Sequence, residues 1–119
     1  MATDPRRFLP LSPQQFHILL ALTDSDRHGY GIILDVAART GAAVKLGTGT
    51  LYTALARLLA LELVVESGRE HERRRYYHLT PLGRDVLKAE TARLAALVRF
   101  AEARGINPAP RSAPARTRS

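Results

Sequence analysis

The sequence contains no cysteine and no tryptophan, and it has only three phenylalanines and four tyrosines. Without cysteine, a disulfide framework, a thiolate nucleophile and a cysteine-based zinc or iron–sulfur site are excluded. No segment approaches the roughly 20 consecutive apolar residues of a membrane-spanning helix, and the first residues lack the apolar run of a signal peptide. From these absences we expect a soluble, cytoplasmic protein.

Acidic residues are scarce relative to basic ones. There are 18 lysines and arginines against 11 aspartates and glutamates, which gives a formal net charge of +7. This excess favours a polyanionic partner, such as nucleic acid or an anionic membrane surface. Three of the net charges lie in residues 105–119, which contain no acid and no periodic apolar face. We expect this basic tail to be disordered, serving either solubility or non-specific phosphate contacts.

The first helix is predicted from the segment LSPQQF, which carries several signals of a helix start. Ser12 is a suitable N-cap, Pro13 fits the first helical position and Gln15 completes a capping box. The apolar run that follows predicts a buried helix ending near Thr23. The polar segment DSDRHG after it is predicted to be a turn.

A second helix is predicted from YGIILDVAART, with Gly41 as its stop. Gly29 and Gly31 at its start suggest close packing on a neighbouring element. The segment AVKLG, which follows, predicts a single short strand. One face of the second helix carries apolar residues at helical spacing and is expected to face the core: Tyr30, Ile33, Leu34 and Ala37.

The third helix is predicted at residues 49–61, within the segment KLGTGTLYTALARL. Thr48 is the expected N-cap. At 100° per residue, four leucines gather on the predicted core face, while Thr50, Thr53 and Arg57 lie opposite and Tyr52 lies at the border. The core-facing leucines of this helix are Leu51, Leu55, Leu58 and Leu59.

A β-hairpin is predicted from the β-rich runs LVVES and RRRYYHL, joined by the polar segment GREHE. Strand alternation places Arg75, Tyr77 and Leu79 on one face, which we expect to be the core face because it ends in leucine. Arg74, Tyr76 and His78 then lie on the other face.

The last helix is predicted to begin after Thr80 as N-cap, with Pro81 at its first position, and to end near residue 104. A helix of about 24 residues is roughly 36 Å long and exceeds the length that so small a core can cover. Part of its apolar stripe therefore needs a partner, most simply the same helix of a second subunit. The stripe consists of Leu87, Leu94, Leu97, Val98 and Ala101.

The order of these elements predicts a mostly α fold with a small β-hairpin, namely a winged helix-turn-helix followed by a dimerisation helix. At 119 residues, the chain has the length of one domain with a modest core. We divide it into an N-terminal arm at 1–11, a winged-helix DNA-binding domain at 12–79, a dimerisation helix at 80–104 and a basic tail at 105–119.

Four motifs in this order and spacing resemble the PadR family of bacterial transcriptional regulators: LSPQQFHILLAL, HGYGI, LGTGTLYTALARL and RRRYYHLTPLG. The single short terminal helix is similar to that of the smaller PadR subfamily. The resemblance implies a homodimeric repressor that leaves its operator when a small molecule, sometimes a phenolic acid or a drug, is bound. The sequence departs from the family where Thr48 replaces a common proline and Thr53 replaces an often larger or basic residue.

In this fold the start of the third helix enters the major groove, so its outward residues are candidates for DNA contacts. Arg57 and Thr53 are placed to reach base edges, and the Tyr52 hydroxyl to donate to a phosphate. Gly49, without a Cβ, would let the helix start approach a phosphate closely. The DNA-binding candidates are Lys45, Thr48, Gly49, Thr50, Tyr52, Thr53, Arg57, Arg73, Arg74 and Arg75.

Other functions are less well supported by the residues. The four histidines share no metal-ligand spacing and no catalytic triad or carboxylate pair is suggested, so we expect no metal, cofactor or enzymatic activity. The resemblance implies an effector pocket, which we expect near Phe16, Leu94 and Phe100. The alternative is a winged-helix module that binds protein rather than DNA, which the acidic residues near the hairpin tip leave open.

Overall fold

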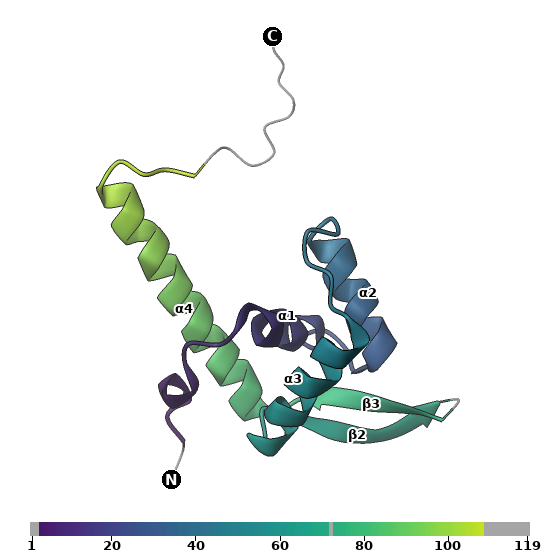
Figure 1. Ribbon diagram of the computed structural model, residues 1–119. Coiled ribbons are helices and arrows are strands. Elements are labelled where there is room, and N and C mark those ends of the chain that lie inside the picture. The colour runs from purple at the N-terminus through teal and green to yellow at the C-terminus, as the bar shows by residue number, and fades with distance from the viewer. Residues whose placement is uncertain (1–2, 72, 109–119) are drawn as a thin grey trace.

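The computed structural model describes residues 3–71 and 73–108. It has a winged helix-turn-helix built from three helices and a hairpin, from which a long C-terminal helix extends, as predicted (Figure 1). Within the described ranges, no helix combines the length and the apolar character needed to cross a bilayer. In chain order the elements are η1 (Pro5–Phe8), α1 (Pro13–Ala21), β1 (Arg27–His28), α2 (Gly29–Arg39), α3 (Thr48–Ala60), β2 (Val64–His71), β3 (Arg74–Leu79) and α4 (Pro81–Ala103).

The sheet is antiparallel with strand order β1-β3-β2, so β3 is its central strand. The predicted alternation of β3 is confirmed, because Tyr77 and Leu79 are buried while Arg75 is exposed on the same face.

The third strand was predicted in the wrong place. Arg27 and His28, expected in a turn, pair with β3, whereas AVKLG is a loop that inserts Leu46 into the core. A strand of two residues is too short to show an alternating pattern in the sequence. β1 is defined only by its pairing with the edge of β3, which lies far away along the chain.

The predicted caps of α1 and α4 are confirmed. The Ser12 hydroxyl accepts from the backbone N–H of Gln15 (3.1 Å) and the Gln15 amide oxygen accepts from that of Ser12 (3.0 Å). The Thr80 hydroxyl accepts from the backbone N–H of Gly83 (2.9 Å). The predicted cap of α3 is wrong, because Gly47 is the N-cap and Thr48 is already helical.

The core face of α3 is confirmed, since Leu51, Leu55 and Leu58 are at most 1% exposed. The predicted core face of α2 is wrong: Tyr30 and Leu34 are 59% and 51% exposed. The buried residues of α2 are instead Gly29, Ile32 and Val36, which also recur at helical spacing. Gly29 belongs to this buried face because α3 packs closely against it: a Cβ there would collide with the Tyr52 hydroxyl and require Tyr52 to move.

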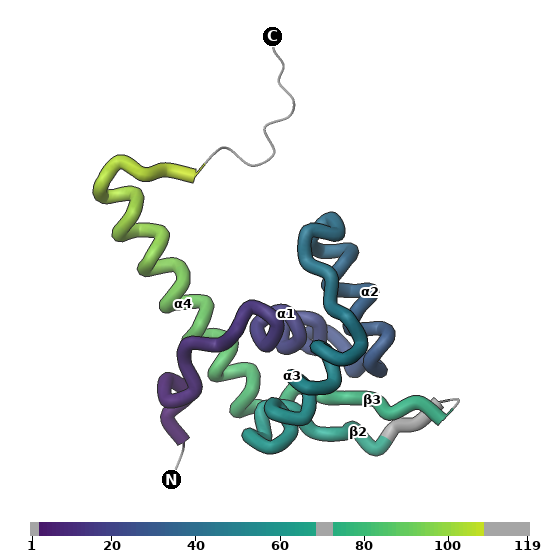
Figure 2. Tube along the Cα trace, viewed as in Figure 1, coloured from purple at the N-terminus to yellow at the C-terminus, as the bar shows by residue number. Residues whose placement is uncertain are grey.

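The two halves of α4 have different surroundings. Its first half packs on η1 and α1, and Leu87 there is 6% exposed, so this residue belongs to the core rather than to a surface stripe. Its second half stands clear of the other elements (Figures 1 and 2). Leu94, Leu97 and Val98 in this half are 37%, 48% and 49% exposed. The tail predicted to be disordered lies, from residue 109 onward, outside the described residues.

The N-terminal arm is held against α4 by a buried carboxylate that the sequence did not single out. Glu90 is 2% exposed, and one of its oxygens accepts from the backbone N–H of Leu11 (3.2 Å). Arg93 donates to both carboxylate oxygens, at 2.6 and 2.9 Å. These Arg93 bonds lower the pKa of Glu90 and outweigh the opposing effect of its burial. Glu90 is therefore charged at neutral pH and fixes the arm.

Replacing Glu90 with alanine is expected to lower the free energy of unfolding by about 1–3 kcal/mol, because a buried N–H then loses its acceptor. Urea titration followed by circular dichroism measures this change. Glu102→Ala, at an exposed position on the same helix, serves as the control and should change stability by less than about 0.5 kcal/mol. Equal stability of the two variants would contradict the role given to Glu90.

Candidate nucleic-acid interface

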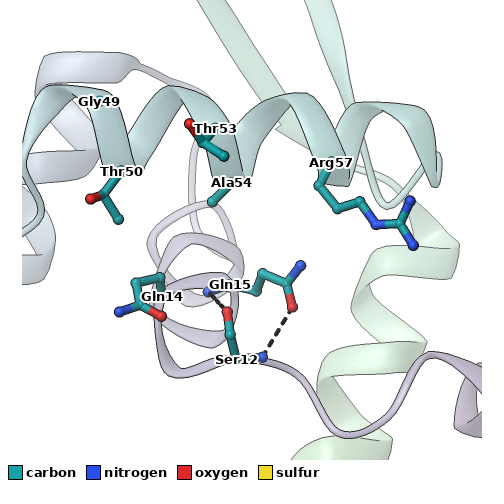
Figure 3. Close-up of a pocket in the computed structure, with 8 residues that line it drawn as sticks. All are labelled: Ser12, Gln14, Gln15, Gly49, Thr50, Thr53, Ala54 and Arg57. Carbon is teal, nitrogen blue, oxygen red and sulfur yellow. Dashed lines mark hydrogen bonds between the residues drawn. The ribbon is translucent and has the colours of Figure 1, made fainter.

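The outward face of α3 is open to solvent and borders a groove of about 670 Å³ (Figure 3). Thr50, Thr53 and Arg57 are exposed along one wall, and the first turn of α1 supplies the other. Because the buried leucines fix the rotation of α3, these three side chains keep the same outward direction. The groove is lined by Ser12, Gln14, Gln15, Gly49, Thr50, Thr53, Ala54 and Arg57.

The start of α3 has unused hydrogen-bond donors. Gly47 as N-cap provides no side-chain acceptor, and no side-chain cap bond is present at this end. The first N–H groups of a helix carry a partial positive charge and attract anions. A Cβ built at Gly49 meets no atom within 4 Å, so packing within the chain does not require glycine there. This helix start is therefore accessible to an external anion.

A second groove, of about 350 Å³, lies between α3, the start of α2 and the hairpin. Tyr52 enters it from α3, seated over Gly29, and three consecutive arginines enter it from the hairpin. Among the side chains that the structure describes, no carboxylate lines this groove, although Arg75 reaches Glu66 at 3.5 Å. The residues that line it are His28, Gly29, Tyr30, Tyr52, Arg73, Arg74 and Arg75. Its chemistry suits an acceptor-rich anion such as phosphate.

His28 adds to the donor excess of this second groove. Its Nδ1 accepts from the backbone N–H of Gly31 (3.0 Å), which caps α2, and its Nε2 lies 2.8 Å from Nη1 of Arg74. A neutral imidazole has one N–H and one acceptor nitrogen, while a guanidinium only donates. If the proton is on Nε2, this N–H points at the Arg74 donor; if it is on Nδ1, it points at the backbone N–H of Gly31. In either tautomer, two donors therefore face each other at one of the two contacts. A phosphate oxygen beside Arg74 would accept from both side chains.

The structure brings most of the predicted DNA-binding residues into these two grooves, on either side of α3. Lys45 and Thr48 are exposed but line neither groove. Sequence reasoning missed the contributions from the starts of α1 and α2, although the two glycines flanking Tyr30 indicated a close helix contact. The lining residues that were not predicted are Ser12, Gln14, Gln15, Ala54, His28, Gly29 and Tyr30.

The residues predicted to bind an effector are in different surroundings. Phe16 packs against the core, whereas Leu94 and Phe100 are 37% and 67% exposed on α4. A single subunit therefore does not enclose all three, and the effector site stays a prediction.

Comparison with known sequences links the chain to regulators. The model of the family described as "Transcriptional regulator PadR-like family" matches residues 18–89. The chain is also 42% identical over 83 residues to an uncharacterised 37.1 kDa protein in transposon TN4556 of Streptomyces fradiae. That match covers 70% of this chain, which spans only 23% of the length of that relative.

Solved structures with similar folds include other transcriptional regulators. One from Clostridium thermocellum has a TM-score of 0.67 and 25% identity, covering 85% of this chain and 97% of that one. A PadR family regulator from Clostridium difficile has a TM-score of 0.63 and 25% identity, covering 77% and 97%. RosR from H. salinarum has a TM-score of 0.64 and 25% identity, covering 83% and 92%.

The cap that His28 provides makes stability depend on pH. Its burial, and next the Arg74 charge, lower the pKa of His28 below the ordinary value. Its contribution to stability is therefore present above the unfolded pKa of about 6.5 and is lost as the pH falls through the lower folded pKa. His28→Asn retains a capping oxygen without a titrating proton, so its stability should fall less between about pH 7.5 and 5.5.

Urea titrations of both proteins at the two pH values measure this difference. The pKa of His17 is also lowered, by burial and then by Arg39, and it affects both proteins equally. An identical loss of stability in both proteins would show that His28 does not titrate as described.

Proposed function

The chain belongs to the PadR-like family of transcriptional regulators, and from this premise we propose that it is a repressor that binds double-stranded DNA sequence-specifically as a homodimer. Such regulators are not enzymes, and we place the activity in the cytoplasm. The observation that carries the proposal is the outward face of α3, which lies between two grooves and presents Thr50, Thr53 and Arg57 without a carboxylate.

The contacts with DNA divide into positioning and base reading. α3 enters the major groove, where Arg57 reads a guanine through two hydrogen bonds and Thr53 contacts a neighbouring base. The start of α3 at Thr48, Gly49 and Thr50 binds a backbone phosphate through its free N–H groups and hydroxyls. The preceding loop adds the charge of Lys45.

The second groove binds a further phosphate. Tyr52 donates its hydroxyl from α3, and the arginines of the hairpin follow the backbone of the adjacent minor groove. The donor excess at His28 and Arg74 supports this assignment, because a phosphate oxygen there satisfies both side chains. The hairpin arginines are Arg73, Arg74 and Arg75.

A homodimer places two such surfaces on one near-palindromic operator. The second half of α4 exposes an apolar stripe that no other described element covers, and its pairing with the same helix of a second subunit buries it. The two α3 helices then enter major grooves about 34 Å apart. The stripe consists of Leu94, Leu97, Val98 and Ala101, whereas Leu87 lies in the core of its own subunit.

Ligand control acts through the same helix. A small aromatic or phenolic effector would bind near Phe16, Leu94 and Phe100, in a site that a second subunit completes. Binding there would change the distance between the two α3 helices and release the operator.

Selection of binding sites from a random DNA library tests the DNA-binding proposal. Wild type should return a near-palindromic logo, and Arg57→Ala should lose preference at one base pair of each half-site, costing about 1–3 kcal/mol there. Lys88→Ala, which removes an exposed cation on α4, should keep the logo. The same logo for Arg57→Ala and wild type would show that Arg57 does not read a base.

Light scattering at micromolar concentration tests the dimer. The wild type should have the mass of two chains, and Leu97→Glu should have the mass of one, because it puts a charge into the apolar contact. Ala92→Glu places the same charge on the opposite, exposed face of α4 and should stay dimeric. A monomeric wild type would remove the half-site geometry.

A further inference from the structure

We infer that the N-terminal arm is part of the DNA-binding surface, with Arg7 of η1 holding a backbone phosphate beside the base-reading Arg57 of α3. This inference rests on the proposed function and extends it to a segment outside the winged helix. It places a third phosphate contact on the side of α3 that faces away from the hairpin.

The evidence begins with a third groove, of about 320 Å³, between the arm and the last turns of α3. Arg7 and Arg57 line it together with Gln15 and apolar side chains of the arm and of α3. The part of the chain that the structure describes contributes no carboxylate to this lining. The groove shares Gln15 and Arg57 with the groove along the outward face of α3, so the two form one continuous surface.

Arg7 differs from its neighbour Arg6 in whether it has an ion-pair partner. Arg6 is neutralised locally, since it donates to both carboxylate oxygens of Asp4 at 3.2 and 3.1 Å. Neither Arg7 nor Arg57 forms an ion pair with any residue that the structure describes, and Arg7 instead lies over the Phe8 ring at 5.6 Å. Two guanidinium groups that share a groove repel each other, and a phosphate bound at Arg7 reduces that repulsion.

The arm is fixed in place, which distinguishes Arg7 from a charge on a free terminus. Phe8 and Leu9 pack against the core, and the buried carboxylate of Glu90 holds the backbone at Leu11. A fixed guanidinium loses less conformational freedom on binding than one on a flexible chain. Arg7 is therefore positioned before DNA arrives.

The arrangement in space agrees with a contact on DNA. In Figure 1, η1 lies on one side of α3 and the hairpin extends on the other, so arm and hairpin flank the recognition helix. η1 also packs on α4, the helix that forms the proposed dimer. The phosphate held by Arg7 is therefore on the side of each half-site that faces α4 and the proposed dimer contact.

Fluorescence anisotropy with two labelled duplexes of equal length tests this contact: one of random sequence, and one returned by the selection experiment. Arg7→Gln should weaken binding to both by a similar factor, roughly 3- to 10-fold, because a phosphate contact carries no sequence information. Its plot of log affinity against log salt should be shallower by about 0.9, the loss of one phosphate contact.

Arg6→Gln is the matched control, because it removes the same charge from the same arm at a residue already paired with Asp4. It should leave the salt slope unchanged. Equal slopes for Arg7→Gln and wild type, or equal losses in both variants, would overturn the inference while leaving the proposed function intact. Failure of the wild type to bind either duplex would count against the proposed function itself.

Discussion

The burial of three leucines on α3 sets the geometry on which the proposed interface depends. Leu51, Leu55 and Leu58 are at most 1% exposed, so α3 cannot rotate about its axis without exposing them to water. Burying each stabilises the fold by about 1.5–3 kcal/mol, which exceeds the roughly 0–1 kcal/mol of a typical exposed ion pair. The packing of the core therefore sets the direction in which Thr53 and Arg57 point. The outward face of α3 is already oriented before a partner binds.

The close contact between α2 and α3 depends on the same constraint. With α3 fixed, Tyr52 reaches the start of α2, and only glycine at position 29 leaves space for it. This contact brings His28 next to the hairpin, where it caps α2 through one ring nitrogen and meets Arg74 at the other. The contact between Gly29 and the half-exposed Tyr52 thus helps to assemble the donor-rich groove from α2, α3 and β3.

Local signals in the sequence predicted the elements whose geometry is local. The capping box at Ser12, the Thr80 cap and the alternation ending at Leu79 depend on residues a few positions apart, and the structure confirms them. The core face of α2 and the position of β1 were wrong because each depends on a partner far away in the sequence. Two apolar stripes of α2 fit a helical period, and only the contact with α3 chooses between them.

The sequence shows an excess of positive charge, but it does not show which arginines pair with groups of their own chain and which are free to bind a partner. In the fold, several arginines are engaged with their own chain: Arg93 with Glu90, Arg39 with Asp35, and Arg84 with the backbone oxygen of Thr23. Arg7 and Arg57 have no such acid within the described residues, and both face one continuous groove. Because an unpaired cation gains most from an external anion, the internal partners of each arginine together with the groove that it lines make Arg7 and Arg57 candidates for contacts with DNA, which the net charge alone does not.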